Sequence, residues 1–241
     1  MRTEQEAYFE RRARRIITRH ETQNYSTVRR MRSTWHNRTL LGNVSLWRLI
    51  QQLAHTVDYT DVMLRTTNQL THVMQVYEGM LLDGIGRLGP ASANWDFERK
   101  LLFLALVHDV GKLLSLFGED DANVDGMNTR VLHGGRSGHE RGLGMDAGVV
   151  SQWNHDEFGY QKLMPHVPAD VAWVVRWHSC VPLISGKLHH VLTPQEKSWL
   201  PLLLMLFEYD HKTKSWNRLP EVEQAGARRI VEGFVPGKMD F

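Results

Sequence analysis

Cysteine is nearly absent from this chain, which has only Cys180 among its 241 residues. A single cysteine excludes an intramolecular disulfide and is typical of a protein from a reducing compartment. Long apolar runs are missing too, because the longest, WLPLLLMLF, is far shorter than the ~18 residues that span a bilayer. The first residues are charged throughout and do not form a secretory signal. These absences predict a cytoplasmic protein without membrane association.

A large excess of charge of one sign is also lacking, since 29 basic residues stand against 27 acidic ones, giving a net charge of +2. This balance argues against a polyanion-binding protein, although the start of the chain, with RRARRIITRH and VRRMRS, is rich in arginine. Nucleic-acid or membrane-surface contact is one interpretation. We favour a solvated amphipathic helix, because the aromatic interleaving of a single-strand binder is missing. Its arginines would pair with Glu4, Glu6, Glu10 and Glu21.

The sequence also lacks a convincing alternation of apolar and polar residues of the kind that predicts strands, and helical periodicity dominates instead. The length suits one well-buried domain. We predict an all-α protein in which an arginine-rich helical extension, residues 1–40, packs on a helical domain, residues 41–241. Glycine-rich stretches at 83–90 and 118–144 are predicted loops. The expected helices lie near residues 4–20, 26–34, 44–54, 66–82, 96–116, 144–153, 156–164, 168–179, 194–209 and 220–233.

What the sequence does contain is a set of metal-ligand residues, most of which continue apolar helical faces. In LLFLALVHDVGKLL, for example, Leu102 and Leu106 lie on the face that leads to Asp109. A buried carboxylate without a partner costs several kcal/mol or becomes protonated. Carboxylates on such faces therefore need cations, and several histidines in matching positions favour a metal over arginine or lysine. The candidate ligands are His72, His108, Asp109, His155, His178 and Asp210.

A histidine on an apolar face has a simpler explanation, since buried polar groups usually hydrogen-bond to the backbone. With 13 histidines some coincidence is expected, and His155 lies near a helix boundary. The adjacent pair His108-Asp109 inside a strongly apolar helix is the hardest element to explain in this way. The other histidines lack such context and are predicted to be surface or loop residues: His20, His36, His55, His133, His139, His166, His189, His190 and His211.

Five ordered motifs give the chain a resemblance to a known family. The order of His72, the pair His108-Asp109 and the distant Asp210 is that of the HD-domain superfamily, and the flanking segments resemble the myo-inositol oxygenase family. The resemblance extends from about Asn24 to the end, where VPGKMDF is also similar. The matching segments are THVMQVYE, LVHDVGKLLSLFGE, WNHDEFGY, RWHSCVPL and FEYDHKTKS.

The resemblance implies a single HD-type helical bundle with a buried di-iron site. The first iron would be held by His72, His108, Asp109 and Asp210. Asp109 would bridge to a second iron, whose other protein ligands would be His155 and His178, with open positions that suit oxygen chemistry. The family reaction is a four-electron, ring-opening oxidation of a cyclic polyol by O2, using a mixed-valent Fe(II)/Fe(III) pair. The implied function is conversion of myo-inositol, or a close cyclitol, to D-glucuronate or its analogue, by a protein for which we favour a monomer.

Two lysines fit the same expected site. Lys112 and Lys214 each stand four residues after a candidate ligand and would share its helix face. The resemblance assigns the family lysines a substrate role, in which Lys112 would help to ionise a bound hydroxyl and act with Asp109 as a catalytic residue. The alternative for both lysines is a snorkelling side chain at the surface.

Further substrate contacts come from the resemblance alone. Ser179 matches a family residue that contacts substrate, and Asp58 and Asp61 match an acidic pair on a loop, for which simple solvation is the alternative. Where the family has a Gly-Asp pair, this chain has Gly126 and Met127, although Asp125 is adjacent and could substitute. The loop at 118–144 is also shorter than in the animal enzymes. Because these differences affect substrate recognition, another cyclitol, a substituted polyol or a different alcohol stays open as the substrate.

Three rival functions share parts of this pattern. An HD phosphohydrolase would use the first four ligands and bind phosphate with the lysines, but the matching flanks around His155, His178 and Lys214 argue against it. An HD-type oxygenase that cleaves an organophosphonate is disfavoured by the lysine pair and the chain ending. A non-catalytic nucleic-acid partner would use the arginine-rich start, and it predicts salt-sensitive binding that Asp109→Ala leaves unchanged.

Overall fold

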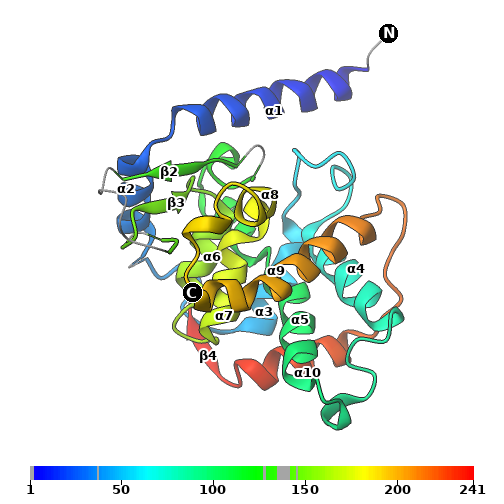
Figure 1. The fold of residues 1–241 in the computed structure, drawn as a ribbon. Coiled ribbons are helices and arrows are strands. Elements are labelled where there is room, and N and C mark those ends of the chain that lie inside the picture. Colours follow the sequence, from blue (N-terminus) through cyan, green and yellow to red (C-terminus); the bar gives the residue numbers. More distant parts are fainter. Residues whose placement is uncertain (1–2, 37, 127–128, 135–141, 145) are drawn as a thin grey trace.

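Helices form nearly all of the regular structure in the computed structural model, which describes residues 3–36, 38–126, 129–134, 142–144 and 146–241 (Figure 1). The predicted all-α fold is confirmed. The α-helices are α1 Glu4–Thr22, α2 Tyr25–His36, α3 Leu46–Gln52, α4 Gln69–Leu82, α5 Trp95–Val107, α6 His155–Leu163, α7 Ala169–Trp177, α8 Val181–Ser185, α9 Pro194–Thr213 and α10 Gln224–Phe234. Short 3-10 helices include η1 Leu53–His55, η3 Val110–Phe117, η4 Asp121–Asn123 and η5 His178–Cys180.

Two small antiparallel sheets were not expected from the sequence. Strand β1, Asn43–Ser45, pairs with β4, Lys238–Asp240, and thereby ties the end of the chain to the start of α3. Strand β2, Val131–His133, pairs with β3, Val149–Ser151. The predicted helix at 144–153 is therefore wrong. Gly144 and Gly148 adopt positive φ angles of 121° and 69°, and the β-branched valines that follow favour an extended strand.

The core is built around α5, which contacts α4, α7, α9 and α10. Every residue from Leu101 to Val107 is buried, so this helix is apolar on all sides. The predicted helix at 96–116 is interrupted, because α5 ends at Val107 and the chain continues as η3 from Val110. The pair His108-Asp109 lies at this junction, in the middle of the molecule.

A close backbone approach joins η3 to α6. A Cβ atom at Gly111 would lie 1.9 Å from the carbonyl oxygen of His155. Because that distance is far inside van der Waals contact, only glycine fits at this position. The junction that carries Asp109 and the start of α6 that carries His155 are thereby held against each other.

Helix α1 lies across one end of the molecule and packs on η4 (Figure 1). Arg12 and Arg15 pair with Asp121 and Asp120 of that turn, while Arg14 pairs with Glu10 in the expected way. The predicted pairing with acids of the same helix is thus wrong for Arg12 and Arg15, which face η4. The division of the chain at residue 40 stays a prediction.

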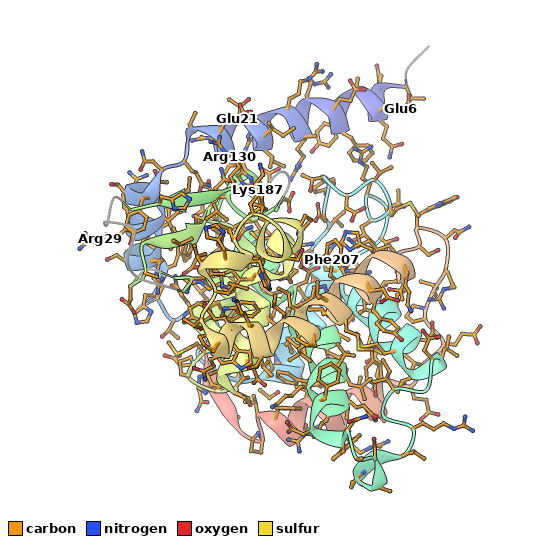
Figure 2. The ribbon with its side chains drawn as sticks, in the orientation of Figure 1. Glu6, Glu21, Arg29, Arg130, Lys187 and Phe207 are labelled. Carbon is orange, nitrogen blue, oxygen red and sulfur yellow. The ribbon has the colours of Figure 1, made fainter. Side chains whose placement is uncertain are left out.

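The exposure of the remaining polar residues mostly follows expectation. Figure 2 shows Glu21 and Arg29 at the periphery, on α1 and α2. His20 corrects the prediction that it lies at the surface, since it is only 1% exposed. His139 lies outside the described residues. Within the described part of the chain, none of the helices combines the length and the apolar character that crossing a bilayer requires.

Candidate metal centre

Six buried histidines and aspartates from five parts of the chain converge at the centre of the fold. Each is at most 8% exposed. They fall into two groups that share Asp109, one with the histidines of α4 and the α5–η3 junction, the other with those of α6 and η5. The structure thus brings together all the ligand candidates of the sequence: His72, His108, Asp109, His155, His178 and Asp210.

The first group is centred on two imidazole nitrogens that face each other. The Nε2 atoms of His72 and His108 are 3.4 Å apart. Each lies 3.6 Å from Oδ2 of Asp109. Oδ1 of Asp210 approaches from α9, 3.0 Å from Nε2 of His72 and 3.8 Å from Nε2 of His108. Two nitrogens and two carboxylate oxygens therefore surround one point.

The second group repeats this arrangement on the other oxygen of Asp109. The Nε2 atoms of His155 and His178 are 3.3 Å apart. Oδ1 of Asp109 lies 3.2 Å from Nε2 of His155 and 3.5 Å from Nε2 of His178. One carboxylate thus directs one oxygen to each histidine pair, which is the geometry of a bridging ligand.

The opposite ring nitrogens fix how three of the imidazoles are oriented. Nδ1 of His155 lies 2.7 Å from the carbonyl oxygen of Val124, and Nδ1 of His178 lies 2.8 Å from that of Val175. Nδ1 of His108 is 3.2 Å from the carbonyl oxygens of Leu104 and Ala105. A ring that donates from Nδ1 to a carbonyl can keep Nε2 free to bind a metal. Nδ1 of His72 has no hydrogen-bond partner among the described residues.

The ionisation of these groups suits cation binding. Burial lowers the pKa of His108 to about 4, against the opposing effect of Asp109 and Asp210, so its imidazole is neutral near pH 7. Burial would raise the pKa of Asp109, but Lys112 and His108 outweigh it and lower that pKa well below its ordinary value. For His155, burial is outweighed by Asp156 and Asp109, which raise its pKa to about 10. A metal ion bound by this nitrogen would replace the proton that these carboxylates favour.

The donor set fits metal ions that prefer mixed nitrogen and oxygen ligands. The four Nε2 atoms converge on carboxylate oxygens, backbone carbonyls hold three of the Nδ1 atoms, and the shared carboxylate would balance positive charge at both points. The simpler explanation, a core histidine bonded to backbone, accounts for one nitrogen of three of the rings but leaves the convergence of four Nε2 atoms unexplained. Each of the two groups could therefore hold a metal ion.

Lys112 lies beside the shared carboxylate. Its Nζ atom is 3.0 Å from Oδ2 of Asp109, 2.8 Å from Oδ2 of Asp58 and 3.1 Å from Oε1 of Gln69. Burial lowers the pKa of Lys112, but Asp109 and Asp58 outweigh it and raise that pKa well above its ordinary value. The lysine is therefore a fixed cation rather than a snorkelling surface residue. Burial would likewise raise the pKa of Asp58, but Lys112 outweighs this effect and lowers that pKa.

A cavity of about 490 Å³ opens onto this centre. Four of the candidate ligands reach its wall, whereas His72 and His108 do not line it. Both histidines of the second group therefore face the cavity, whereas the first group reaches it only through Asp210 and the shared Asp109. The predicted substrate residues that the structure describes all line the same cavity: Asp58, Asp61, Lys112, Gly126, Ser179 and Lys214.

The departure from the family pattern can be followed only in part. Met127 lies outside the described residues. Asp125, suggested above as a substitute acid, lines a smaller cavity of about 240 Å³, which Lys112 also borders. Burial and the neighbouring Asp58 raise the pKa of this carboxyl well above its ordinary value. Asp125 is absent from the lining of the larger cavity, which does not support the suggested substitution.

Sequence reasoning missed Asp156, which is fully buried in the first turn of α6. Its Oδ1 atom lies 2.9 Å from Nε2 of His155 and 3.5 Å from Nε2 of His178. The signal was available, because His155-Asp156 is a second adjacent His-Asp pair like His108-Asp109. Phe207 of α9, labelled in Figure 2, also lines the cavity and was not singled out.

The sequence is similar to those of known proteins over much of its length. The family described as myo-inositol oxygenase matches residues 10–134, more than half of the chain. An inositol oxygenase from Danio rerio is 24% identical over 253 residues, which cover 92% of this chain and 86% of the relative. One from Rattus norvegicus is 24% identical, with 82% of this chain and 75% of the relative covered. One from Homo sapiens is 27% identical over 57% of this chain and 59% of its own length.

Proposed function

The chain belongs to the myo-inositol oxygenase family, and from this membership we propose that it is a di-iron enzyme that oxidises a cyclic polyol with O2. As a member of that family the chain is an enzyme. The proposed substrate is myo-inositol or a close cyclitol, and the proposed product of myo-inositol is D-glucuronate. The observation that carries the proposal is Asp109, which directs one carboxylate oxygen to each of two buried histidine pairs.

Iron would supply the chemistry that the side chains cannot. When bound, a mixed-valent Fe(II)/Fe(III) pair would activate O2 for a four-electron, ring-opening oxidation. His72, His108 and Asp210 would hold one ion, His155 and His178 the other, with Asp109 shared. Both histidines of the second group line the cavity and neither histidine of the first does, which supports substrate access at the second ion.

Lys112 would act as a cation at the substrate hydroxyl. Its raised pKa rules out a role as a proton acceptor near pH 7, because the ammonium keeps its proton between Asp58 and Asp109. A fixed positive charge favours the ionised form of a neighbouring hydroxyl. Asp58 and Gln69 would hold the ammonium at this place, so that it helps to ionise the substrate without leaving the cavity wall.

The remaining features of the proposal rest on the resemblance and on composition. We propose an HD-type arrangement of the helices, which the order of His72, His108-Asp109 and Asp210 supports. A monomer and a cytoplasmic location stay predictions.

Lys214 gives the first prediction. Its Nζ atom lies 2.8 Å from Oδ2 of Asp61 and 3.5 Å from Oδ1 of Asp210, at the cavity wall. We expect Lys214→Ala to raise the KM for the polyol by about tenfold to a hundredfold, because a hydrogen bond to a charged group contributes roughly 1.5–3 kcal/mol. The turnover number should change less. Steady-state kinetics with iron content measured in parallel would show this.

Lys212 supplies the matched control for that variant. It lies two residues earlier, is exposed and pairs with Asp83 away from the cavity. Lys212→Ala should leave KM and turnover unchanged. If Lys214→Ala also leaves both values at those of the wild type, Lys214 does not take part in substrate binding.

Electron paramagnetic resonance on partly oxidised, iron-loaded protein tests the proposed function. A coupled mixed-valent signal that changes when myo-inositol is added supports the di-iron centre and the polyol. A mixed-valent signal indifferent to myo-inositol would redirect the search to other alcohols and to organophosphonates. No coupled signal, together with metal-dependent hydrolysis of phosphate esters, would move the chain to the HD phosphohydrolases.

A further inference from the structure

The carboxylate of Asp156 accepts two hydrogen bonds from Ser179, a residue of the cavity wall, in addition to its contacts with His155 and His178. Oδ1 of Asp156 accepts from the Ser179 hydroxyl at 3.0 Å, and Oδ2 accepts from the Ser179 backbone N–H at 3.3 Å. The backbone of Asp156 is held in the first turn of α6, since Asn154 caps this helix and accepts from the Asp156 backbone N–H. Asp156 has 0% exposure, so water cannot take the place of Ser179. The pair therefore connects α6 to η5 at the edge of the cavity.

We propose that Asp156 is a positioning residue that fixes Ser179 as a hydrogen-bond acceptor toward the substrate. An ionised carboxylate only accepts hydrogen bonds, whereas a serine hydroxyl has one proton to donate and two lone pairs. Because that proton is directed to Asp156, the hydroxyl oxygen presents only lone pairs to the cavity. This wall of the cavity therefore selects a ligand group that donates, namely a hydroxyl.

The surroundings of Ser179 support this assignment. A Cβ atom at Gly126 would lie 3.1 Å from Oγ of Ser179 and 3.1 Å from Cε1 of His155. Glycine at this position leaves the space next to the serine oxygen open for a ligand atom. The inference rests on the proposed function for the identity of that ligand as a polyol, while the direction of the serine hydroxyl follows from Asp156 itself.

A specificity follows from this arrangement. A ketone in which one hydroxyl of the polyol is replaced by a carbonyl oxygen would place two acceptors against each other at Ser179. Sites built to pair with a hydroxyl discriminate strongly against analogues that leave polar groups unpaired. For the ring position that faces Ser179, we expect the wild type to bind the ketone at least about tenfold more weakly than the alcohol.

The test uses iron-loaded protein without O2, so that binding is measured in the absence of turnover. The ligands are myo-inositol and its single-ketone analogues, titrated by calorimetry, with iron per chain measured on each sample. Asp156→Asn offers an amide that can donate to the serine oxygen and release its proton toward the cavity. We expect this variant to keep its iron and to bind myo-inositol about tenfold more weakly. We also expect it to lose or reverse the discrimination against the ketone whose carbonyl oxygen faces Ser179.

Two further variants keep the test decisive if Asp156→Asn folds poorly. Ser179→Ala should weaken binding of myo-inositol while leaving binding of that same ketone unchanged, since the serine has no proton to give it. The double variant should be no weaker than the weaker single variant, because the two residues act through one contact. Asp96→Asn is the matched control, an exposed first-turn acid of α5 that pairs with Lys100 and should change nothing.

The outcomes separate the inference from the proposed function. Unchanged discrimination in Asp156→Asn or additive losses in the double variant would overturn the positioning role. Loss of one iron in Asp156→Asn would overturn it as well, and would make Asp156 a metal ligand through its contacts with His155 and His178. If the wild type retains iron but binds no polyol, the proposed substrate fails, and with it the role of Ser179 as acceptor for a polyol.

Discussion

Replacing Asp109 with alanine is expected to abolish metal binding at both groups and to reduce polyol oxidation to background. The reason is geometric, because Oδ2 of Asp109 faces the His72 and His108 pair while Oδ1 faces His155 and His178. Without this carboxylate, the four imidazoles would have to bind two metal cations with no negative charge between them. Iron per chain, measured after loading and desalting, should fall from about two to background.

A buried carboxyl close by provides the control for Asp109→Ala. Asp125 is 4% exposed, belongs to neither histidine group, and has a pKa that burial and Asp58 raise well above its ordinary value. Asp125→Asn preserves the shape of the side chain and should keep its iron. Lys112 in the Asp109 variant still has Asp58 and Gln69 as partners, so the protein should fold, which circular dichroism would verify. Activity retained with less than one iron per chain would contradict the di-iron proposal.

The sequence predicted the helical elements well where periodicity was long and uninterrupted. The expected helix at 4–20 corresponds to α1, that at 194–209 to α9, and that at 168–179 to α7 with η5. The helix at 144–153 failed because apolar residues in a short segment satisfy helical and strand patterns alike. The glycines at 144 and 148 were the better signal there. Pairing of β1 with β4 joins residues almost 200 positions apart, which no local pattern can predict.

Most of the candidate ligands were predictable because each continues an apolar helical face, where a polar residue is not expected. Local patterns could not show that Asp109 divides its two oxygens between two histidine pairs, since this depends on where α4, α6 and α9 pack around it. The partners of the α1 arginines were mispredicted for the same reason. Acids within one helix are visible in the sequence, whereas Asp120 and Asp121 become partners only through folding.

A buried ion pair holds the two helices that carry the second histidine pair. Nε of Arg176 on α7 donates to Glu157 on α6 at 2.7 Å, and its Nη2 atom donates to the other carboxylate oxygen at 3.3 Å. Glu157 is two residues after His155, and Arg176 is two residues before His178, so the pair lies close to both imidazoles along the chain. Glu157 is 0% exposed and also receives Arg32 of α2 at 3.0 Å.

Arg176→Met should destabilise the folded protein by roughly 3–5 kcal/mol, because it leaves a fully buried carboxylate with one half-buried cationic partner, Arg32, besides the amide of Gln161. For a chain of this length that corresponds to a fall in Tm of about 6–20 °C, measurable by calorimetry on the metal-free protein. Adding Glu157→Leu should restore a large part of the loss, since a well-packed apolar pair can replace a buried ion pair at little net cost. Arg14→Met, which removes only the exposed pair with Glu10, should shift the free energy of unfolding by less than about 0.5 kcal/mol. A loss below about 1 kcal/mol in Arg176→Met would mean that apolar packing alone holds α6 against α7.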